Sequence, residues 1–200
     1  MKYLYLDVGG VLLTNGWDHV ARGEASRVFG IDYEDMALRH DFIYNVYEIG
    51  KISLDQYLDT VVFHRPRHFT RAEFTEFMFS RSEELPDTLP WLAEWKLEHP
   101  EVTVISINNE ARDLNRYRIE RFGLHRLFDA FVSSCEVGMR KPDPGIFRLA
   151  LGLAQTEPSS CLYFDDREML VASAASVGLD ARLHESAEAT CAAIDEWVKR

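Results

Sequence analysis

Polar side chains follow four short apolar runs of the chain. They are Asp7 with Gly9 and Gly10, Ser106 to Asn108, Lys141, and Asp165 with Asp166. A carboxylate beside glycines can act as a covalent nucleophile, which divides one difficult displacement into two easier ones. Three carboxylates around a phosphate would repel it unless a hard cation lay among them, and Mg²⁺ prefers such oxygen ligands. These residue types therefore predict phosphoryl transfer assisted by Mg²⁺.

Each residue has a role in this prediction. Asp7 is the nucleophile, and Asp7, Asp165, Asp166 and the Gly9 carbonyl are the expected metal ligands. Lys141 offsets the remaining negative charge, while the Ser106 hydroxyl donates to phosphate oxygens. The glycines allow close approach of the backbone. The expected substrate-binding positions are Gly10, Ile107, Asn108, Asn15 and Trp17.

Local structure also explains each residue taken singly. Asp7 can cap a turn, Ser106 can satisfy backbone groups, and the acidic pair can cap a helix. Lys141 can be a solvated loop cation. The functional interpretation depends on all four groups meeting at one edge of a sheet.

The apolar runs are typical of buried strands separated by helices. Tyr3 to Val8 predicts a strand that ends in a glycine loop. Further strands are expected at 102–107, 128–133, 162–164 and 181–183, with helices between them. Asp143 and Pro144 suit the N-cap and first position of one of these helices. Alternating strands and helices joined by short loops indicate an α/β fold with a parallel sheet, whose ligands bind at the carboxyl ends of the strands.

Residues 17–84 contain no comparable apolar strand and predict only helices. Ser53 with Gln56, and Thr70 with Glu73, fit the capping box that starts a helix. This stretch is therefore an all-helical insertion between the first strand and the rest of the sheet. Asn15 and Trp17 follow the glycine loop closely enough to face the site.

The composition of the chain indicates which classes of protein and partner are excluded. The chain of 200 residues is 46% hydrophobic, which predicts a globular fold rather than a disordered one. A formal charge of −11 argues against nucleic acid or anionic membranes as partners. Three cysteines without metal-site spacing suggest reduced thiols and a cytoplasmic location. The apolar start is too short for a signal peptide, and no later run reaches membrane-spanning length.

Four segments resemble the motifs of the haloacid dehalogenase-like hydrolase superfamily. They are Tyr5 to Leu12, Val104 to Ser106, Gly138 to Pro142, and Tyr163 to Asp166. The resemblance covers essentially the whole chain and implies a Rossmann-like parallel-sheet core with a small all-helical cap of the C1 type. Residues 1–14 and 86–200 would form the core and residues 15–85 the cap. The sequence is most similar to the branch that includes bacterial glucose-1-phosphate phosphatases.

The resemblance implies a magnesium-dependent phosphomonoester hydrolase that forms an aspartyl phosphate. Its substrate would be a small phosphorylated metabolite, such as a sugar phosphate, and the protein would be a monomer or homodimer. One position departs from the family pattern. The usual phosphatases carry a second aspartate two residues after the nucleophile, where this chain has Gly9. A glycine there cannot transfer a proton to the leaving group.

Three explanations of Gly9 remain open. The enzyme can be a phosphatase whose substrate has a good leaving group. It can be a 2-haloacid dehalogenase, since halide needs no proton, although the adjacent acidic pair suits a metal better. It can be a catalytically weak protein that binds metal or phosphate in a regulatory role.

Overall fold

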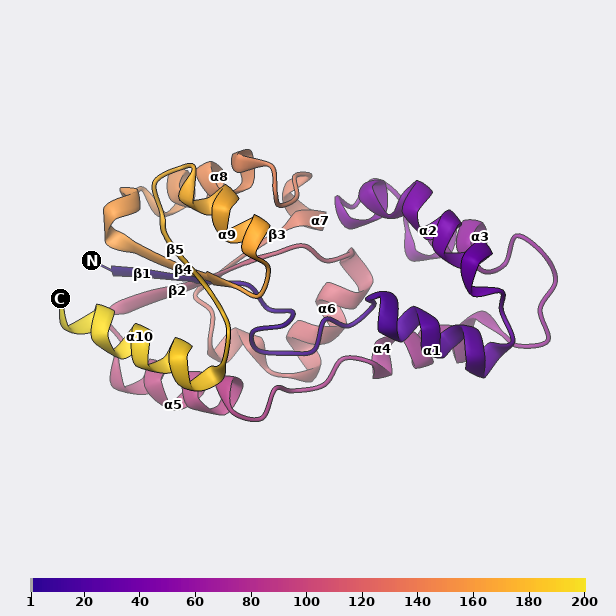
Figure 1. Ribbon diagram of the computed structural model, residues 1–200, viewed down its shortest axis with the longest axis horizontal. Coiled ribbons are helices and arrows are strands. Elements are labelled where there is room, and N and C mark those ends of the chain that lie inside the picture. The colour runs from indigo at the N-terminus through magenta and orange to yellow at the C-terminus, as the bar shows by residue number, and fades with distance from the viewer. Residues whose placement is uncertain (1) are drawn as a thin grey trace.

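The computed structural model describes residues 2–200, and its centre is a five-stranded parallel sheet in the order β3-β2-β1-β4-β5. The strands are β1 (Lys2–Leu6), β2 (Val102–Asn108), β3 (Ala130–Ser133), β4 (Cys161–Asp165) and β5 (Asp180–Leu183). The register pairs Leu6 with Ser106 on one side of β1 and with Phe164 on the other. The central strands therefore end close to one another, at one edge of the sheet (Figure 1).

Helices cover both faces of the sheet. On one face, α5 (Thr88–Glu98) and α10 (Ala187–Lys199) pack against Leu4 and Leu6 of β1. On the other face, α8 (Pro144–Ala154) and α9 (Glu168–Ala175) pack around Tyr5. The other helices connected to the sheet are α6 (Arg112–Arg121), η1 (Leu124–Arg126), α7 (Ser134–Val137) and η2 (Pro158–Ser160). Because neighbouring side chains of a strand point to opposite faces, β1 contributes to both apolar layers.

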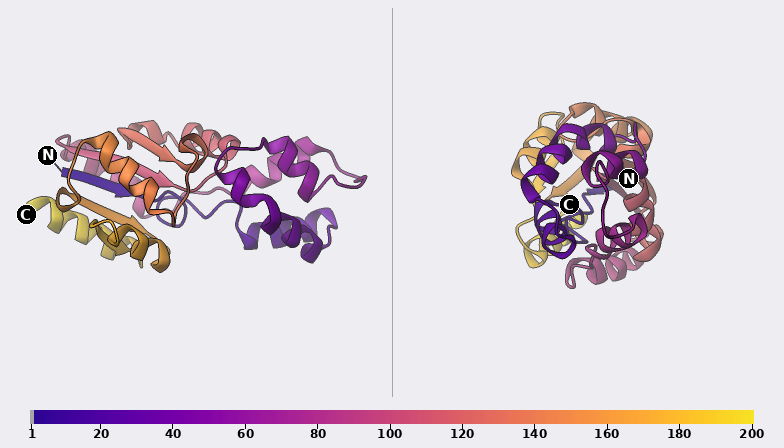
Figure 2. Two further views of the ribbon diagram at one scale, coloured as in Figure 1. Left: turned by 90° about the horizontal axis from the view of Figure 1, so that it is seen from above. Right: turned by 90° about the vertical axis from the view of Figure 1, so that its right-hand side faces the viewer.

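Four helices are inserted between β1 and α5. They are α1 (His19–Phe29), α2 (Tyr33–Glu48), α3 (Leu54–Val61) and α4 (Arg71–Ser80). They enclose an aromatic and aliphatic cluster of their own, to which Ala111 and Leu114 at the start of α6 also belong. The strand arrowheads point toward these helices, which lie beyond the carboxyl ends of the strands (Figure 2).

The sequence signals for helix ends are confirmed. Ser53 with Gln56 and Thr70 with Glu73 both form capping boxes. The Asp143 side chain accepts a hydrogen bond from the Gly145 amide at the start of α8, with Pro144 in the first turn. These caps satisfy amide groups that have no partner within the helix.

The predicted Rossmann-like α/β fold with a helical insertion is confirmed, while the predicted strand ends were wrong by one or two residues. β1 ends at Leu6 rather than Val8, and β2 continues to Asn108 rather than ending at Ile107. The segments that lead into and out of the helical insertion run side by side. Thr14 N donates to Glu83 O, and Leu85 N donates to Leu12 O, both at 2.9 Å.

The cysteines form no disulfide: Cys135 and Cys161 are buried thiols and Cys191 is half-buried. Among the helices of residues 2–200, none has both the length and the apolar character needed to cross a membrane.

Candidate active site

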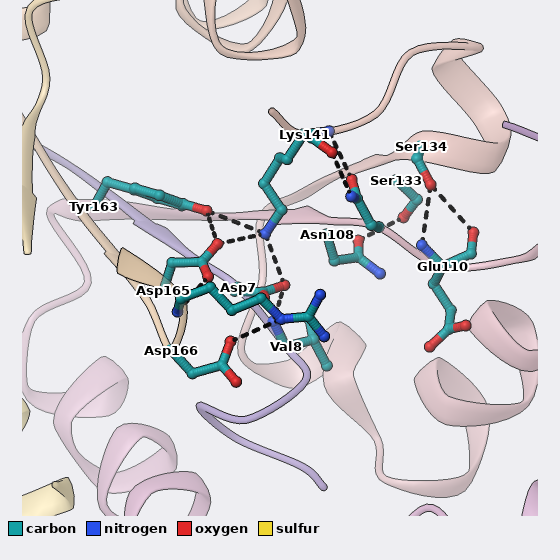
Figure 3. A network of polar contacts seen from close by, with 12 residues as sticks. Asp7, Val8, Asn108, Glu110, Ser133, Ser134, Lys141, Tyr163, Asp165 and Asp166 are labelled. Carbon is teal, nitrogen blue, oxygen red and sulfur yellow. Dashed lines mark hydrogen bonds and ion pairs between the residues drawn. The ribbon is translucent and has the colours of Figure 1, made fainter. Parts of the chain in front are cut away.

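The ends of β1 and β4 bring two aspartates against a buried lysine. Lys141 Nζ lies 3.1 Å from Asp7 Oδ1 and 2.7 Å from Asp165 Oδ2. Only 1% of Lys141 and none of Asp165 is exposed, whereas Asp7 keeps 8% of its surface open. Figure 3 shows the ammonium group between the two carboxylates. The three residues predicted to meet at this edge of the sheet therefore do so.

Several contacts fix the position of Lys141. Its backbone amide donates to Asn109 Oδ1, and Asn109 Nδ2 donates back to the Lys141 carbonyl, both at 2.8 Å. Its Nζ also donates to Tyr163 Oη at 3.1 Å, and that hydroxyl donates in turn to Asp165 Oδ2. Asn109 and Tyr163 are thus parts of the site that the sequence analysis missed.

Asp7, Asp165 and Asp166 fit a divalent cation. One oxygen from each carboxylate can be chosen so that all three lie within 4.8 Å of one another. Three carboxylates and one ammonium carry a net charge of −2, which a divalent ion would balance. Asp166 Oδ1 is buried and accepts no hydrogen bond. Both oxygens of Asp165, in contrast, already accept, from Arg167 N, Tyr163 and Lys141. Asp7 and Asp166 are therefore better placed than Asp165 to bind a metal ion.

Burial dominates the electrostatics of Asp7. It raises the pKa of Asp7 to about 6, although Lys141 acts in the opposite direction. The Val8 amide donates to Asp7 Oδ1 at 2.8 Å and holds the carboxylate in one orientation. A cation beside this group would favour the ionised form, which is the nucleophilic one.

The glycine loop after β1 brings backbone close to the acidic cluster. Gly10 N donates to Leu13 O and Leu13 N donates to Val8 O, and within the described chain no donor reaches the Gly9 carbonyl. That carbonyl is thus free to bind a metal. Gly10 has a φ of +73°, and a Cβ built there would lie 2.2 Å from Asp166 Oδ2. The absence of a side chain at Gly10 therefore lets the Asp166 carboxylate occupy its position.

This crowding makes Gly10→Ala a sharp test of the loop. A left-handed backbone costs a residue with a Cβ about 1–2 kcal/mol, and here Asp166 must also move. We expect a lower melting temperature and at least tenfold weaker Mg²⁺ binding by calorimetry, about 1.4 kcal/mol. Gly152→Ala is the matched control, since a Cβ there has nothing within 4 Å and should leave Mg²⁺ binding unchanged. Unaltered Mg²⁺ affinity in Gly10→Ala would show that Asp166 is not a ligand.

A cavity of about 500 Å³ opens between this cluster and the inserted helices. Asp7, Gly9, Lys141, Asn108 and Asn109 line it from the sheet. From the helical side it is lined by residues of α1 and α2 and of the segment before them, among them Asn15, Trp17, Asp18, Arg22, His40, Tyr44, Tyr47 and Glu48. The volume suits a small ligand.

Asn15 and Trp17, both predicted to bind substrate, lie in different surroundings. Asn15 Nδ2 donates to Asp166 Oδ2 at 3.1 Å, so this side chain orients a candidate metal ligand. Trp17 lines the cavity, but its Nε1 donates to Tyr57 Oη at 2.8 Å, and its ring packs edge-on against Phe74. Trp17 is 8% exposed and is mainly part of the apolar cluster of the inserted helices.

Neither Ser106 nor Ile107 is among the residues that line the cavity. Because β2 continues to Asn108, both residues lie inside the strand. Ile107 packs in an apolar cluster, and Ser106 is fully buried with its hydroxyl unpartnered. Asn108, which points to the same face as Ser106 two residues further on, reaches the cavity instead. Its Nδ2 donates to Asn115 Oδ1 at 3.1 Å, and its Oδ1 accepts from Ser133 Oγ at 3.0 Å.

A buried ion pair that the sequence analysis missed lies beside Gly9. Arg118 Nη1 donates to Glu110 Oε2 at 2.6 Å and lies 3.8 Å from the position of a Cβ on Gly9. Glu110 lines the cavity, and burial raises its pKa to about 7 against the opposing effect of Arg118. The partner of a titratable carboxyl group therefore lies near the position that a side chain at residue 9 would occupy.

The family model of haloacid dehalogenase-like hydrolases matches residues 1–178 of this chain. The chain belongs to this family. Among solved structures, a HAD family enzyme of Bacteroides thetaiotaomicron superposes with a TM-score of 0.79 at 20% identity, covering 92% of this chain and 93% of that one. The same enzyme in complex with magnesium and inorganic phosphate gives a TM-score of 0.77 at 20% identity, with the same coverage. The L-2-haloacid dehalogenase of Xanthobacter autotrophicus gives 0.61 at 17% identity, covering 90% of this chain and 75% of that one.

Curated relatives of this haloacid dehalogenase-like hydrolase match shorter segments. Phosphatase MT3486 of Mycobacterium tuberculosis (strain CDC 1551 / Oshkosh) is 36% identical over 101 residues, which is 49% of this chain and 45% of that protein. Bifunctional epoxide hydrolase 2 of Sus scrofa is 46% identical over 39 residues, 20% of this chain and 7% of that protein. The chain thus spans less than half the length of both relatives.

Proposed function

We propose that this haloacid dehalogenase-like hydrolase is a magnesium-dependent phosphatase that acts through an aspartyl phosphate on Asp7. Its substrate is a small phosphorylated metabolite, such as a sugar phosphate, which fits a cavity of about 500 Å³. The observation that carries this proposal is the group formed by Asp7, Asp165 and Asp166, which can place one carboxylate oxygen each within 4.8 Å of one another. Lys141 contacts Asp7 and Asp165, and Asp7 and Lys141 line the cavity. A relative named as a phosphatase and a structural neighbour that holds magnesium and phosphate support it.

The metal would be held by Asp7, Asp166 and the Gly9 carbonyl. When bound, Mg²⁺ offsets the charge of the phosphoryl group and allows an anionic nucleophile to approach it. Asp165, whose oxygens are already engaged, positions Lys141. The Lys141 ammonium then donates to the nucleophile or to a phosphoryl oxygen. Asn108 is a candidate donor to the phosphate from the end of β2.

The reaction proceeds in two displacements at phosphorus. An Asp7 oxygen forms a bond to phosphorus while the ester P–O bond breaks, and the leaving oxygen takes up a proton. Water then attacks the same phosphorus, loses a proton, and releases inorganic phosphate and the Asp7 carboxylate. Each step therefore needs a group that gives or accepts a proton.

Glu110 is the group we assign to this proton transfer, since Gly9 has no side chain. It lines the same cavity, and its partner Arg118 lies 3.8 Å from the Cβ position of residue 9. A pKa of about 7 lets the carboxyl group both donate and accept a proton near neutral pH. Arg118 keeps the side chain in place through its 2.6 Å contact.

The helical cap closes the cavity over this site. We assign residues 15–85 to the cap and residues 1–14 and 86–200 to the core, with the paired segments at Thr14 and Glu83 as the connection. A cap over the aspartyl phosphate would exclude bulk water during the first displacement.

An assay with the whole chain separates phosphatase activity from the alternatives. We expect hydrolysis of p-nitrophenyl phosphate that requires Mg²⁺ and stops with EDTA. Chloride release from 2-chloropropionate without metal would identify a dehalogenase instead, the activity of the Xanthobacter autotrophicus neighbour. Failure of both, with measurable Mg²⁺ or phosphate binding, would identify a binding protein.

A further inference from the structure

The cap contains a buried arginine that has no acidic partner. Arg22 of α1 lines the cavity and is 9% exposed. Its Nη1 donates to the Trp17 carbonyl at 2.8 Å, while its Nε is buried and has no acceptor. Throughout residues 2–200, no carboxylate oxygen lies within 4.0 Å of its guanidinium group.

The other arginines of the cavity are paired. Arg118, the second buried arginine of the described chain, contacts Glu110 at 2.6 Å. Arg140 contacts Glu48 at 2.8 Å, and Arg167 lies 3.9 Å from Asp166. Arginine stays charged in proteins, and burying its charge without a counter-ion is costly. An anion supplied by a ligand would complete the environment of Arg22.

The surroundings of Arg22 supply a second unpartnered group. Trp17, whose carbonyl Arg22 contacts, donates through its ring to Tyr57 Oη, and His40 Nδ1 lies 2.7 Å from that hydroxyl. Tyr47 stacks on Tyr57 with ring centroids 4.3 Å apart, and the Tyr47 hydroxyl is buried without a partner. Tyr47 and His40 both line the cavity.

Nearby titratable groups do not neutralise Arg22. Burial and Arg22 lower the pKa of His40 to about 3, so this imidazole is neutral. Asp18 caps α1 by accepting from Ala21 N, and Asp41 is exposed to solvent. The positive charge of Arg22 is therefore available to a ligand that enters the cavity.

We propose that Arg22 binds a second anionic group of the substrate, a carboxylate or a further phosphate, at the cap side of the cavity. The inference rests on the proposed function, because the first phosphate lies at Asp7. The planar guanidinium binds both kinds of oxyanion through paired N–H groups, and the Tyr47 hydroxyl is a candidate additional donor. The substrate class is thus narrower than the phosphorylated metabolites proposed above. It is a phosphomonoester that carries a second negative group, rather than the monophosphate of a neutral sugar or alcohol.

Phosphate esters of equal chain length, with and without a second anionic group, test whether Arg22 binds that group. For chains of two and four carbons, kcat/KM is measured for the alkyl phosphate, the phosphate ester with a terminal carboxylate, and the bisphosphate. Binding of the same compounds to Asp7→Asn is followed by thermal shift with Mg²⁺ present. The variants are Arg22→Met, Arg22→Lys and the control Arg27→Met, an exposed arginine of the same helix.

We expect the wild type to prefer an anionic ester by about 10- to 100-fold, the range of a charge-assisted hydrogen bond. Arg22→Met should lose this preference, Arg22→Lys should keep part of it, and Arg27→Met should keep all of it. If the ester with a terminal carboxylate is preferred, the second group is a carboxylate, and if the bisphosphate is preferred, it is a phosphate. A preference that survives in both Arg22 variants, or no preference at any chain length, would overturn the inference. If no ester is hydrolysed but the binding preference depends on Arg22, the proposed function fails while the anion site stands.

Discussion

Asp7→Asn should abolish turnover of p-nitrophenyl phosphate, lowering kcat by about 10⁴-fold or more, as removal of a covalent nucleophile does. An amide cannot form the bond to phosphorus. The substitution keeps the size of the side chain and the oxygen that accepts from the Val8 amide. Lys141 keeps its 2.7 Å contact with Asp165, so the fold has no new unpaired buried charge.

Two measurements make this result specific. The melting temperature of Asp7→Asn should stay within a few degrees of the wild type, since about 1 kcal/mol shifts a domain of this size by about 2–4 °C. Asp180→Asn, on the edge strand β5 and away from the cavity, is the matched control and should retain full activity. Residual turnover above one hundredth of wild type in a folded Asp7→Asn protein would show that Asp7 is not the nucleophile.

Glu110→Gln should slow esters with poor leaving groups far more than esters with good ones. An alkyl alcohol needs a proton as it leaves, whereas p-nitrophenolate does not, so only the alkyl ester loses the factor of about 10²–10⁴ that proton transfer supplies. The measured quantity is the ratio of kcat/KM for ethyl phosphate to that for p-nitrophenyl phosphate, which is compared within each variant. An unchanged ratio would remove Glu110 from the mechanism.

Gly9→Asp should restore the proton transfer to the leaving group that Glu110→Gln removes. A Cβ at residue 9 would lie 3.1 Å from Asn15 Oδ1 and 3.8 Å from Arg118 Nη1, so a small shift of Asn15 makes room for the side chain. Adding Gly9→Asp to Glu110→Gln should restore ethyl phosphate turnover and leave p-nitrophenyl phosphate turnover nearly unchanged. Equal effects on both esters would place the limiting step elsewhere.

The raised pKa of Glu110 also predicts two pH effects of definite sign. The acid form donates the proton, so kcat/KM for ethyl phosphate should fall as pH rises through about 7, and Glu110→Gln should lack this decline. The folded chain binds this proton more tightly than the unfolded chain does, so the associated stability is present below about pH 4.5 and is lost as pH rises to about 7. The melting temperature of the wild type should therefore fall relative to that of Glu110→Gln over this window. Parallel curves would mean that Glu110 titrates normally.

The sequence predicted those parts of the site that depend on strand ends. Asp7 and Asp165 converge because parallel strands finish at a common edge, and apolar runs reveal where such strands lie. Lys141 joins them from the loop between α7 and α8. Asn108 was predicted as a substrate-binding residue and lines the cavity, whereas Ser106, two residues earlier in β2, is fully buried. Tyr163 was within reach of the same reasoning, because alternate residues of a strand share a face with Asp165.

Contacts between distant elements were beyond sequence reasoning. Glu110 and Arg118 acquire their importance only when α6 packs beside the glycine loop, and no local pattern marks either residue. The unpaired state of Arg22 is likewise visible only after the cap helices are assembled, since it depends on which carboxylates do not approach it. Propensity and spacing describe elements, whereas such pairs depend on tertiary packing.

The most direct test of the central claim is a crystal structure of the chain with Mg²⁺ and beryllium fluoride, a mimic of the phosphoryl group. The proposed mechanism predicts continuous density from an Asp7 carboxylate oxygen to beryllium, with a cation held by Asp7, Asp166 and the Gly9 carbonyl, and Lys141 beside the fluorides. A mimic bound away from Asp7, with that carboxylate still directed only at Lys141 and the Val8 amide and no cation among the three aspartates, would contradict it.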